Sequence, residues 1–164
     1  MTMRTLAIAA AALLVSATAA LAAPASVSVT IGPQLQIKAE KTLGVRDVNE
    51  LAARLRTTVE RRLAKTGPYD GARIELVLAD VQPNRPTFKQ LGDKPGLSYQ
   101  SFGIGGAKIE GRAIAANGAV TPIGYTYYES DIRWARRGGT WADAEWTFDR
   151  FAYDLARGQA LASR

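Results

Sequence analysis

The chain has 164 residues, with 21 Lys and Arg against 15 Asp and Glu, and a formal net charge of +6. It contains no Cys and no His, which excludes disulfides, thiol nucleophiles, His-based catalytic triads and the usual zinc or redox-metal ligand sets. A basic chain attracts anionic partners, although solubility alone also explains such a charge.

The N-terminal segment has the pattern of a secretory signal peptide. Arg4 precedes an almost uninterrupted apolar run over residues 6–21, and Ala20-Leu21-Ala22 fits a small-x-small cleavage site. A retained membrane anchor is the alternative, but no stop-transfer charges follow. We therefore expect residues 1–22 to be removed, leaving a periplasmic protein (alternatively a secreted one) with no transmembrane span and no nucleic-acid partner.

Residues 25–37 are predicted to form the first strand, because apolar residues alternate there with Ser28 and Thr30. Gly32-Pro33 interrupts the alternation before Leu35 and Ile37 resume it, which suggests an edge strand or a bulge.

Residues 47–66 are predicted to form the first helix. Asp47 and Glu50 have the spacing of a capping box, and Gly67-Pro68 provides a stop. The apolar residues recur at three- and four-residue spacing, giving a stripe of Val48, Leu51, Ala52, Leu55, Val59 and Leu63. The basic residues on the other faces complement the helix dipole and need no ligand; they are Arg54, Arg56, Arg61, Arg62 and Lys65.

Residues 72–81 are predicted to form a central strand, because both of its faces are largely apolar. One face has Ile74, Leu76 and Leu78, and the other has Val77, Ala79 and Val81.

A long connection follows over residues 82–101. Loops of this length tend to be functional or mobile, and this one combines basic and aromatic residues. A packed surface loop without a ligand is the alternative. If the protein has a partner site, we expect it here, at Arg85, Phe88, Lys89 and Tyr99.

A β-hairpin is predicted within residues 99–130. Asn117-Gly118 joins two alternating runs and indicates a type I′ turn. The glycine cluster Gly103, Gly105 and Gly106 lacks the spacing of a nucleotide-binding loop, so we interpret it as allowing a bulge or a close approach of backbones.

The connector at residues 131–139 is strongly basic. Its arginines lie beside an aromatic residue, a combination suited to recognising phosphate or carboxylate, which adds Arg133, Trp134, Arg136 and Arg137 to the candidate partner site. The alternative is a solvated connector that neutralises the acidic start of the next helix, at Asp143, Glu145 and Asp149.

The last helix is predicted over residues 140–157, with Thr140 as N-cap and Gly158 as C-terminal stop. Its apolar stripe consists of Trp141, Ala144, Phe148, Phe151, Ala152 and Leu155. We expect a frayed tail at residues 159–164.

These elements predict an α+β fold: a single four-stranded mixed sheet in the order β-α-β-β-β-α, with two helices packed on one face. Residues 23–158 are expected to form one domain.

The run GIGGAKIEGRAI at residues 103–114, before an Asn-Gly hairpin, resembles a group of small bacterial envelope domains, many of them lipoproteins. The curli-secretion and penicillin-binding-protein-activator lipoproteins share a similar order of helices and strands. The likeness covers residues 47–157, and the chain differs in lacking the lipidated cysteine. The resemblance implies a non-enzymatic accessory or assembly role and carries over no site residues.

We therefore expect an exported, non-enzymatic protein without a cofactor that binds another envelope protein. A second hypothesis is binding of an anionic envelope glycan or lipid through the same arginines. A third is a carboxylate-dependent hydrolase that uses Glu129 and Asp131, two apart on a predicted strand.

Overall fold

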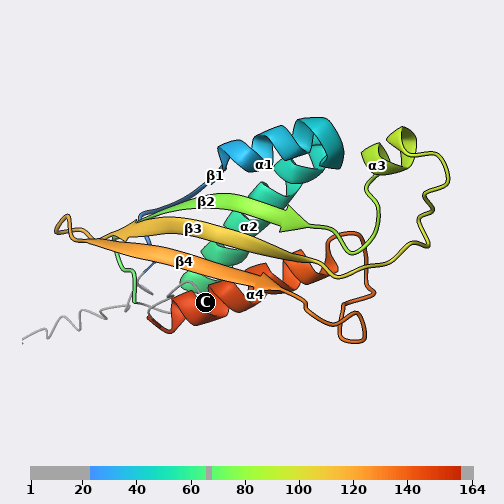
Figure 1. Cartoon of the computed structure of the whole chain (residues 1–164). Helices are drawn as coiled ribbons and strands as arrows, with labels where there is room; N and C mark the ends of the chain where they lie inside the picture. Colours follow the sequence, from blue (N-terminus) through green and yellow to red (C-terminus); the bar gives the residue numbers. More distant parts are fainter. Residues whose placement is uncertain (1–22, 66–67, 160–164) are drawn as a thin grey trace, which may run out of the picture.

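The computed structural model describes residues 23–65 and 68–159. The predicted signal peptide, the Gly67 part of the first helix stop and residues 160–164 of the predicted tail lie outside the described residues. The strands are β1 (Ser26–Ile31), β2 (Arg73–Gln82), β3 (Gly106–Ile114) and β4 (Val120–Tyr128). They form one sheet in the order β1-β2-β3-β4, in which β1 and β2 are parallel and the other pairs antiparallel (Figure 1).

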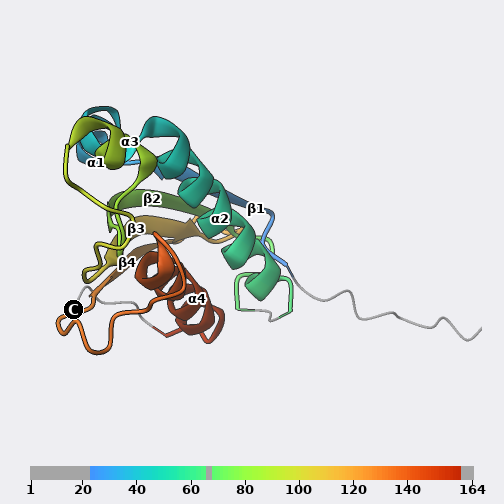
Figure 2. The same ribbon diagram turned by 90° about the vertical axis from the view of Figure 1, so that its right-hand side faces the viewer.

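The helical elements are α1 (Pro33–Lys38), the π-helical turn η1 (Ala39–Leu43), α2 (Val45–Leu63), α3 (Phe88–Asp93) and α4 (Ala142–Ala156). The long helices α2 and α4 pack against each other and against one face of the sheet (Figure 2). This arrangement confirms the predicted α+β class and the mixed four-stranded sheet. No described helix has the length and apolar character needed to cross a bilayer.

The buried apolar residues form one cluster between the sheet and the two long helices. Its largest fully buried side chains include Phe148, Phe151, Leu55, Ile74 and Ile109. The predicted stripe of α2 is buried throughout, and that of α4 is buried except for Trp141, which packs partly buried against the core. Helical periodicity therefore identified the core faces correctly.

The first strand is shorter than its sequence predicts. β1 ends at Ile31, and Pro33 occupies the first turn of α1, with Leu35 fully buried on that helix. Proline favours this position because its fixed φ suits a helix and its missing N–H has no intrahelical acceptor there. The prediction that the strand continues to Ile37 was wrong.

The start of α2 also differs from the prediction. Its N-cap is Gly44, at φ 100°, and no side chain caps the helix, so the predicted Asp47–Glu50 box does not form. Glu50 instead pairs with Arg46 one turn back, at 2.8 Å. At the other end the helix stops at Leu63, three residues before the predicted end.

A β-bulge in β2 changes which residues face the core. Leu78 pairs with Ile109 and Asp80 with Lys108, so Ala79 is the extra residue. Beyond the bulge Val81 turns to the helix-covered face and is fully buried. The prediction that Val81 shares a face with Val77 was therefore wrong.

The bulge also places Asp80 on the open face of the sheet, where it joins three elements. Lys38 at the end of α1 donates to Asp80 Oδ1 (2.8 Å) and to the carbonyl of Val81 (2.7 Å). Tyr128 at the end of β4 donates to Asp80 Oδ2 (2.6 Å). Burial, followed by this hydrogen bond and the Asp80 charge, raises the pKa of Tyr128.

The β3–β4 hairpin is confirmed, but its turn is not type I′. The N–H of Gly118 donates to the carbonyl of Ala115, and only Gly118 has positive φ (85°). Ala115 N–H then donates to the carbonyl of Ala119, and the N–H of Ala119 donates to Asn117 Oδ1. This is a three-residue loop with a glycine at the left-handed position, the next commonest hairpin connection.

Glycines in β3 allow a close approach of neighbouring strands. A Cβ on Gly106 would lie 2.2 Å from the carbonyl oxygen of Tyr127, and one on Gly111 would lie 2.2 Å from that of Glu75. The interpretation of the glycine cluster as a site of close backbone approach holds at Gly106.

Candidate functional site

The long connection after β2 is ordered by its own short helix. The Thr87 hydroxyl accepts from Gln90 N–H (3.2 Å), and Gln90 Oε1 accepts from Thr87 N–H (3.0 Å), so α3 begins with a capping box. This box was not predicted, although Thr87 and Gln90 have its spacing in the sequence. The loop therefore contains regular, hydrogen-bonded secondary structure.

Asn84 closes the base of this loop. Its carbonyl accepts from Gly103 N–H (2.8 Å) and its Nδ2 donates to the Gly103 carbonyl (3.1 Å). Its own N–H donates to the carbonyl of Thr140, just before α4 (2.7 Å). One buried amide therefore fixes both ends of the loop to the start of the last helix.

Asp143, in the first turn of α4, is the centre of the buried polar network. Its carboxylate accepts from Asn84 Nδ2, from Gly105 N–H (3.0 Å), and from Arg136 through both N–H (3.1 Å) and Nη1 (3.2 Å). Burial alone raises the pKa of Asp143, but the hydrogen bonds from Asn84, Arg136 and Gly105 outweigh it and hold the pKa below its usual value. The carboxylate is therefore ionised at neutral pH and links two loops.

The predicted N-cap of the last helix was wrong. The N-cap of α4 is Trp141, and no side chain caps the helix; Thr140 contributes only its carbonyl, which accepts from Asn84 N–H.

Arg136 lies against an aromatic pair. Its guanidinium carbon lies 4.0 Å from the Trp146 ring centroid, and Tyr127 packs on the same indole at 4.7 Å. The Tyr127 hydroxyl donates to Glu129 Oε2 (2.7 Å). Arg136 thus belongs to the buried network. It pairs with Asp143 at the start of α4, as expected under the alternative that the connector neutralises the acidic start of the last helix.

A second stack joins the two predicted partner segments. The Phe102 ring has Arg85 at 5.3 Å and Arg137 at 4.8 Å, measured from guanidinium carbon to ring centroid. Arg85 also lies 5.8 Å from the Tyr99 ring and donates to the Tyr99 carbonyl (3.2 Å). The structure therefore brings the loop and the basic connector together through Phe102, which was not among the predicted site residues.

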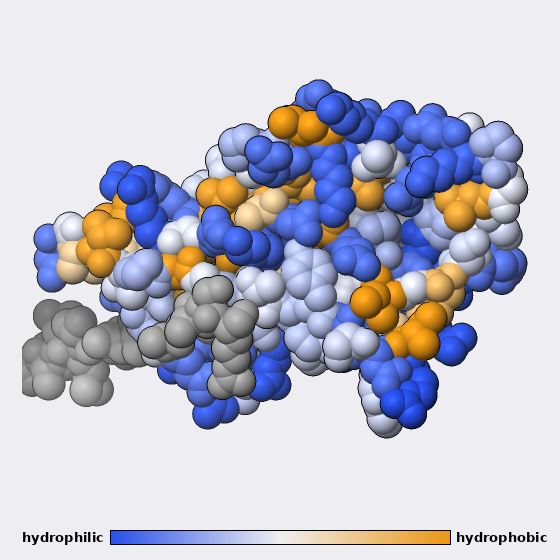
Figure 3. All heavy atoms as spheres, in the orientation of Figure 1, coloured by the Kyte–Doolittle hydropathy of each residue, from blue (hydrophilic) through white to orange (hydrophobic). Residues whose placement is uncertain are grey.

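Large aromatic side chains are exposed at this end of the molecule. Phe88 is 83% exposed, Trp134 72% and Tyr99 49%. They occupy the end of the molecule where β2 and β4 finish, the end that carries α3 in Figure 1. Figure 3 shows apolar spots among charged residues at this end. We call this region, defined by Arg85, Phe88, Tyr99, Phe102, Trp134 and Arg137, the end surface.

A hollow of about 380 Å³ opens beside the stack. Pro83, Pro86, Leu97, Phe102 and Ile104 give it apolar walls, and Arg85 and Lys94 are its cationic groups. None of the described residues that line it is a carboxylate. Its volume is at the lower end of the range for small-molecule pockets.

The remaining predicted partner residues are paired. Lys89 forms an ion pair with Asp93 (2.9 Å), and Arg133 pairs with Asp131. Their charges are therefore less available to a ligand than those of Arg85 and Arg137.

The predicted carboxylate pair does not share a strand face. β4 ends at Tyr128, and the chain turns so that the N–H groups of Ser130 and Asp131 donate to Glu129 Oε1. The Tyr127 hydroxyl bond is the main factor that lowers the pKa of Glu129, and the Arg133 bond lowers that of Asp131. Neither group has the raised pKa of a general acid.

Among residues 23–65 and 68–159, no group of three or more acidic side chains is placed to hold a metal ion. Comparisons of the chain with protein-family models, with curated proteins and with solved structures found no match. The likeness to envelope lipoproteins therefore stays a prediction.

Proposed function

We propose that the protein is an exported, non-enzymatic accessory protein of the bacterial envelope that binds another envelope protein through the end surface. The observation that carries this proposal is the exposure of three large aromatic side chains: Phe88 on α3, Tyr99 in the loop after it and Trp134 in the connector after β4. Large aromatic side chains are typical anchors of protein interfaces, because each buries a large apolar area on binding.

The charges of the end surface indicate the chemistry of the partner. Arg85, Lys94 and Arg137 lie among the aromatic residues and apolar walls. A segment with an apolar side chain and a neighbouring carboxylate complements this combination, because the carboxylate pairs with a guanidinium while the apolar group fills the hollow.

Binding of anionic glycan or lipid at the same place has less support. Arg133 and Arg136 are each paired with a carboxylate, which leaves Arg137 as the connector arginine without an ion pair among the described residues. Nothing in the site supports a hydrolase based on Glu129 and Asp131, because both carboxylates are held by local hydrogen bonds.

The test is capture of the partner from envelope extract by residues 23–164, followed by affinity measurement. Replacing Phe88→Ser and Trp134→Ser together should weaken binding at least about 30-fold, since each anchor is worth about 1–2 kcal/mol or more. Ile37→Ser with Val120→Ser removes two other exposed apolar side chains and serves as the matched control.

The salt dependence separates the two kinds of partner. An interface with an apolar centre should persist at high ionic strength, whereas phosphate-dominated binding should weaken steeply. Retention of the partner by the Phe88 and Trp134 double variant would contradict the proposal.

A further inference from the structure

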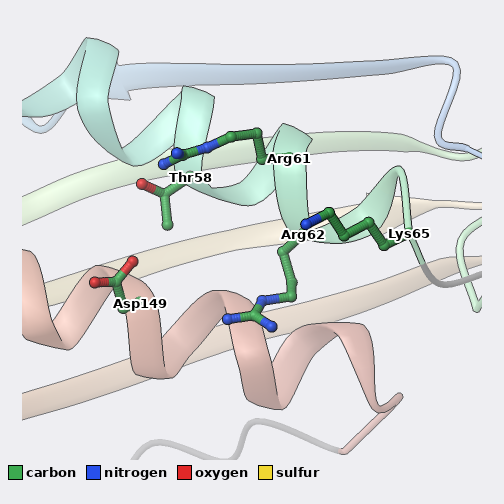
Figure 4. A pocket seen from close by; sticks show the side chains of 5 residues that line it. All are labelled: Thr58, Arg61, Arg62, Lys65 and Asp149. Atoms are coloured by element: carbon green, nitrogen blue, oxygen red, sulfur yellow. The ribbon is translucent and has the colours of Figure 1, made fainter.

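A second hollow, of about 220 Å³, lies between α2 and α4, away from the end surface. Figure 4 shows its walls: the side chains of α2 come from its last two turns and from Lys65 just after it, and Asp149 faces them from α4. The residues that line it are Thr58, Arg61, Arg62, Lys65 and Asp149. Three cationic groups therefore face one carboxylate across a small space.

Two cations of this hollow, Arg61 and Lys65, differ from most others in the described part of the chain. Arg46, Arg54, Arg56, Arg112 and Arg150 each form an ion pair with a carboxylate. Within the described part of the chain, Arg61 and Lys65 form no such pair, and Asp149 also has none. The positive charges of Arg61 and Lys65 are therefore not neutralised by an ion pair with any residue that the structure describes.

The side chains of Arg61 and Lys65 extend along the surface of α2 (Figure 4). The ammonium of Lys65 is directed back along α2 toward Arg62, and Arg61 extends toward Thr58 (Figure 4). Arg61 and Arg62 lie in the last turn of α2, where their charges also complement the helix dipole. Arg62 is held in position by the Tyr153 ring, 5.5 Å from its guanidinium carbon.

We propose that this basic hollow binds a phosphoryl group whose substituent carries hydroxyl groups. Arg61, Arg62 and Lys65 bind the phosphoryl oxygens, because guanidinium groups match them bidentately and an ammonium adds a point charge. Asp149 would repel a bare phosphate, but its carboxylate accepts hydrogen bonds from hydroxyl groups on the substituent. The volume admits a phosphoryl group with one small substituent.

Two sources carry this chemistry: a free polyol phosphate and the phosphoglycerol headgroup of a lipid. Isothermal titration of residues 23–164 with glycerol phosphate and with inorganic phosphate tests the site itself. Sedimentation with phosphatidylcholine vesicles, with and without phosphatidylglycerol, tests the lipid source.

Glycerol phosphate should bind, and Arg61→Gln with Lys65→Gln should weaken its binding at least about tenfold, because two charge-assisted contacts are lost. The matched control is Arg46→Gln with Arg56→Gln, which makes the same charge change on α2 outside the hollow. Equal weakening in both variants, or no binding to the unaltered protein, would overturn the proposal. Binding to phosphatidylglycerol vesicles identifies the headgroup as ligand, and binding only in solution identifies the free polyol phosphate.

Asp149→Asn tests the hydroxyl part of the proposal separately. Inorganic phosphate should bind this variant more tightly, because a repulsive charge is removed, while the preference for glycerol phosphate over inorganic phosphate should fall severalfold. An unchanged preference would refute the role of Asp149. None of these substitutions touches the end surface, so the outcome is independent of the partner proposed there.

Discussion

Single residues decide how closely the strands and loops of this protein approach. A Cβ on Gly106 would collide with the backbone of β4, and Asn84 and Asp143 are hydrogen-bonded across 59 positions of sequence. Such positions depend on contacts between distant segments. A local pattern therefore identifies them as unusual, as it did for the glycine cluster, without showing what they contact.

Gly106→Ala should destabilise the protein by roughly 3 kcal/mol or more, because the new methyl group would lie 2.2 Å from the Tyr127 carbonyl oxygen and the strands must separate. Gly138→Ala is the control, since a Cβ there has no atom within 4 Å. Urea unfolding of both variants measures the difference. Equal free energies of unfolding would show that the β3–β4 pair adjusts without cost.

At the scale of elements, hydrophobic periodicity predicted the regular faces of helices and strands but missed the interruptions within them. The stripe of α2 and the alternation of β3 were predicted correctly, because each is set by the geometry of its own element. The bulge at Ala79 was missed, because it depends on pairing with β3. The buried network was missed for the same reason: the Asn84–Asp143 contact has no local sequence signal.

The bulge makes a specific prediction for two valines of β2. Val81→Ala should cost about 2 kcal/mol, because two methyl groups leave a fully buried site, whereas Val77→Ala, on the open face, should cost less than about 1 kcal/mol. Chemical denaturation of the two variants checks this. Equal costs would mean that β2 has no bulge in solution and that both valines share a face, as strict alternation suggests.

At the scale of the whole molecule, the buried Asp143 network ties the sheet ends, both loops and α4 together, and it links stability to pH. The pKa of Asp143 is lowered in the folded state, so its contribution is present above the unfolded value of about 4 and is lost as pH falls through the folded value. The protein should therefore lose stability on acidification below about pH 4.

Asp143→Asn should lower the free energy of unfolding at neutral pH by about 3 kcal/mol, because the Arg136 guanidinium loses its buried partner. It should also flatten the loss of stability in acid. Glu50→Gln, which removes an exposed carboxylate paired with Arg46, is the control. Urea unfolding at several pH values measures both effects, and an acid dependence equal to that of the unaltered protein would contradict this role of Asp143.

The closure of the loop by Asn84 and Gly103 has a consequence for how the protein can change. Because the two residues are hydrogen-bonded to each other 19 positions apart, the ends of the segment between them are joined independently of what that segment contains. The cost of closing a loop grows only slowly with its length. Residues 85–102 can therefore be replaced as a unit. We expect the sheet and its helices to keep their fold when this segment varies among related chains or when a different recognition loop is grafted there.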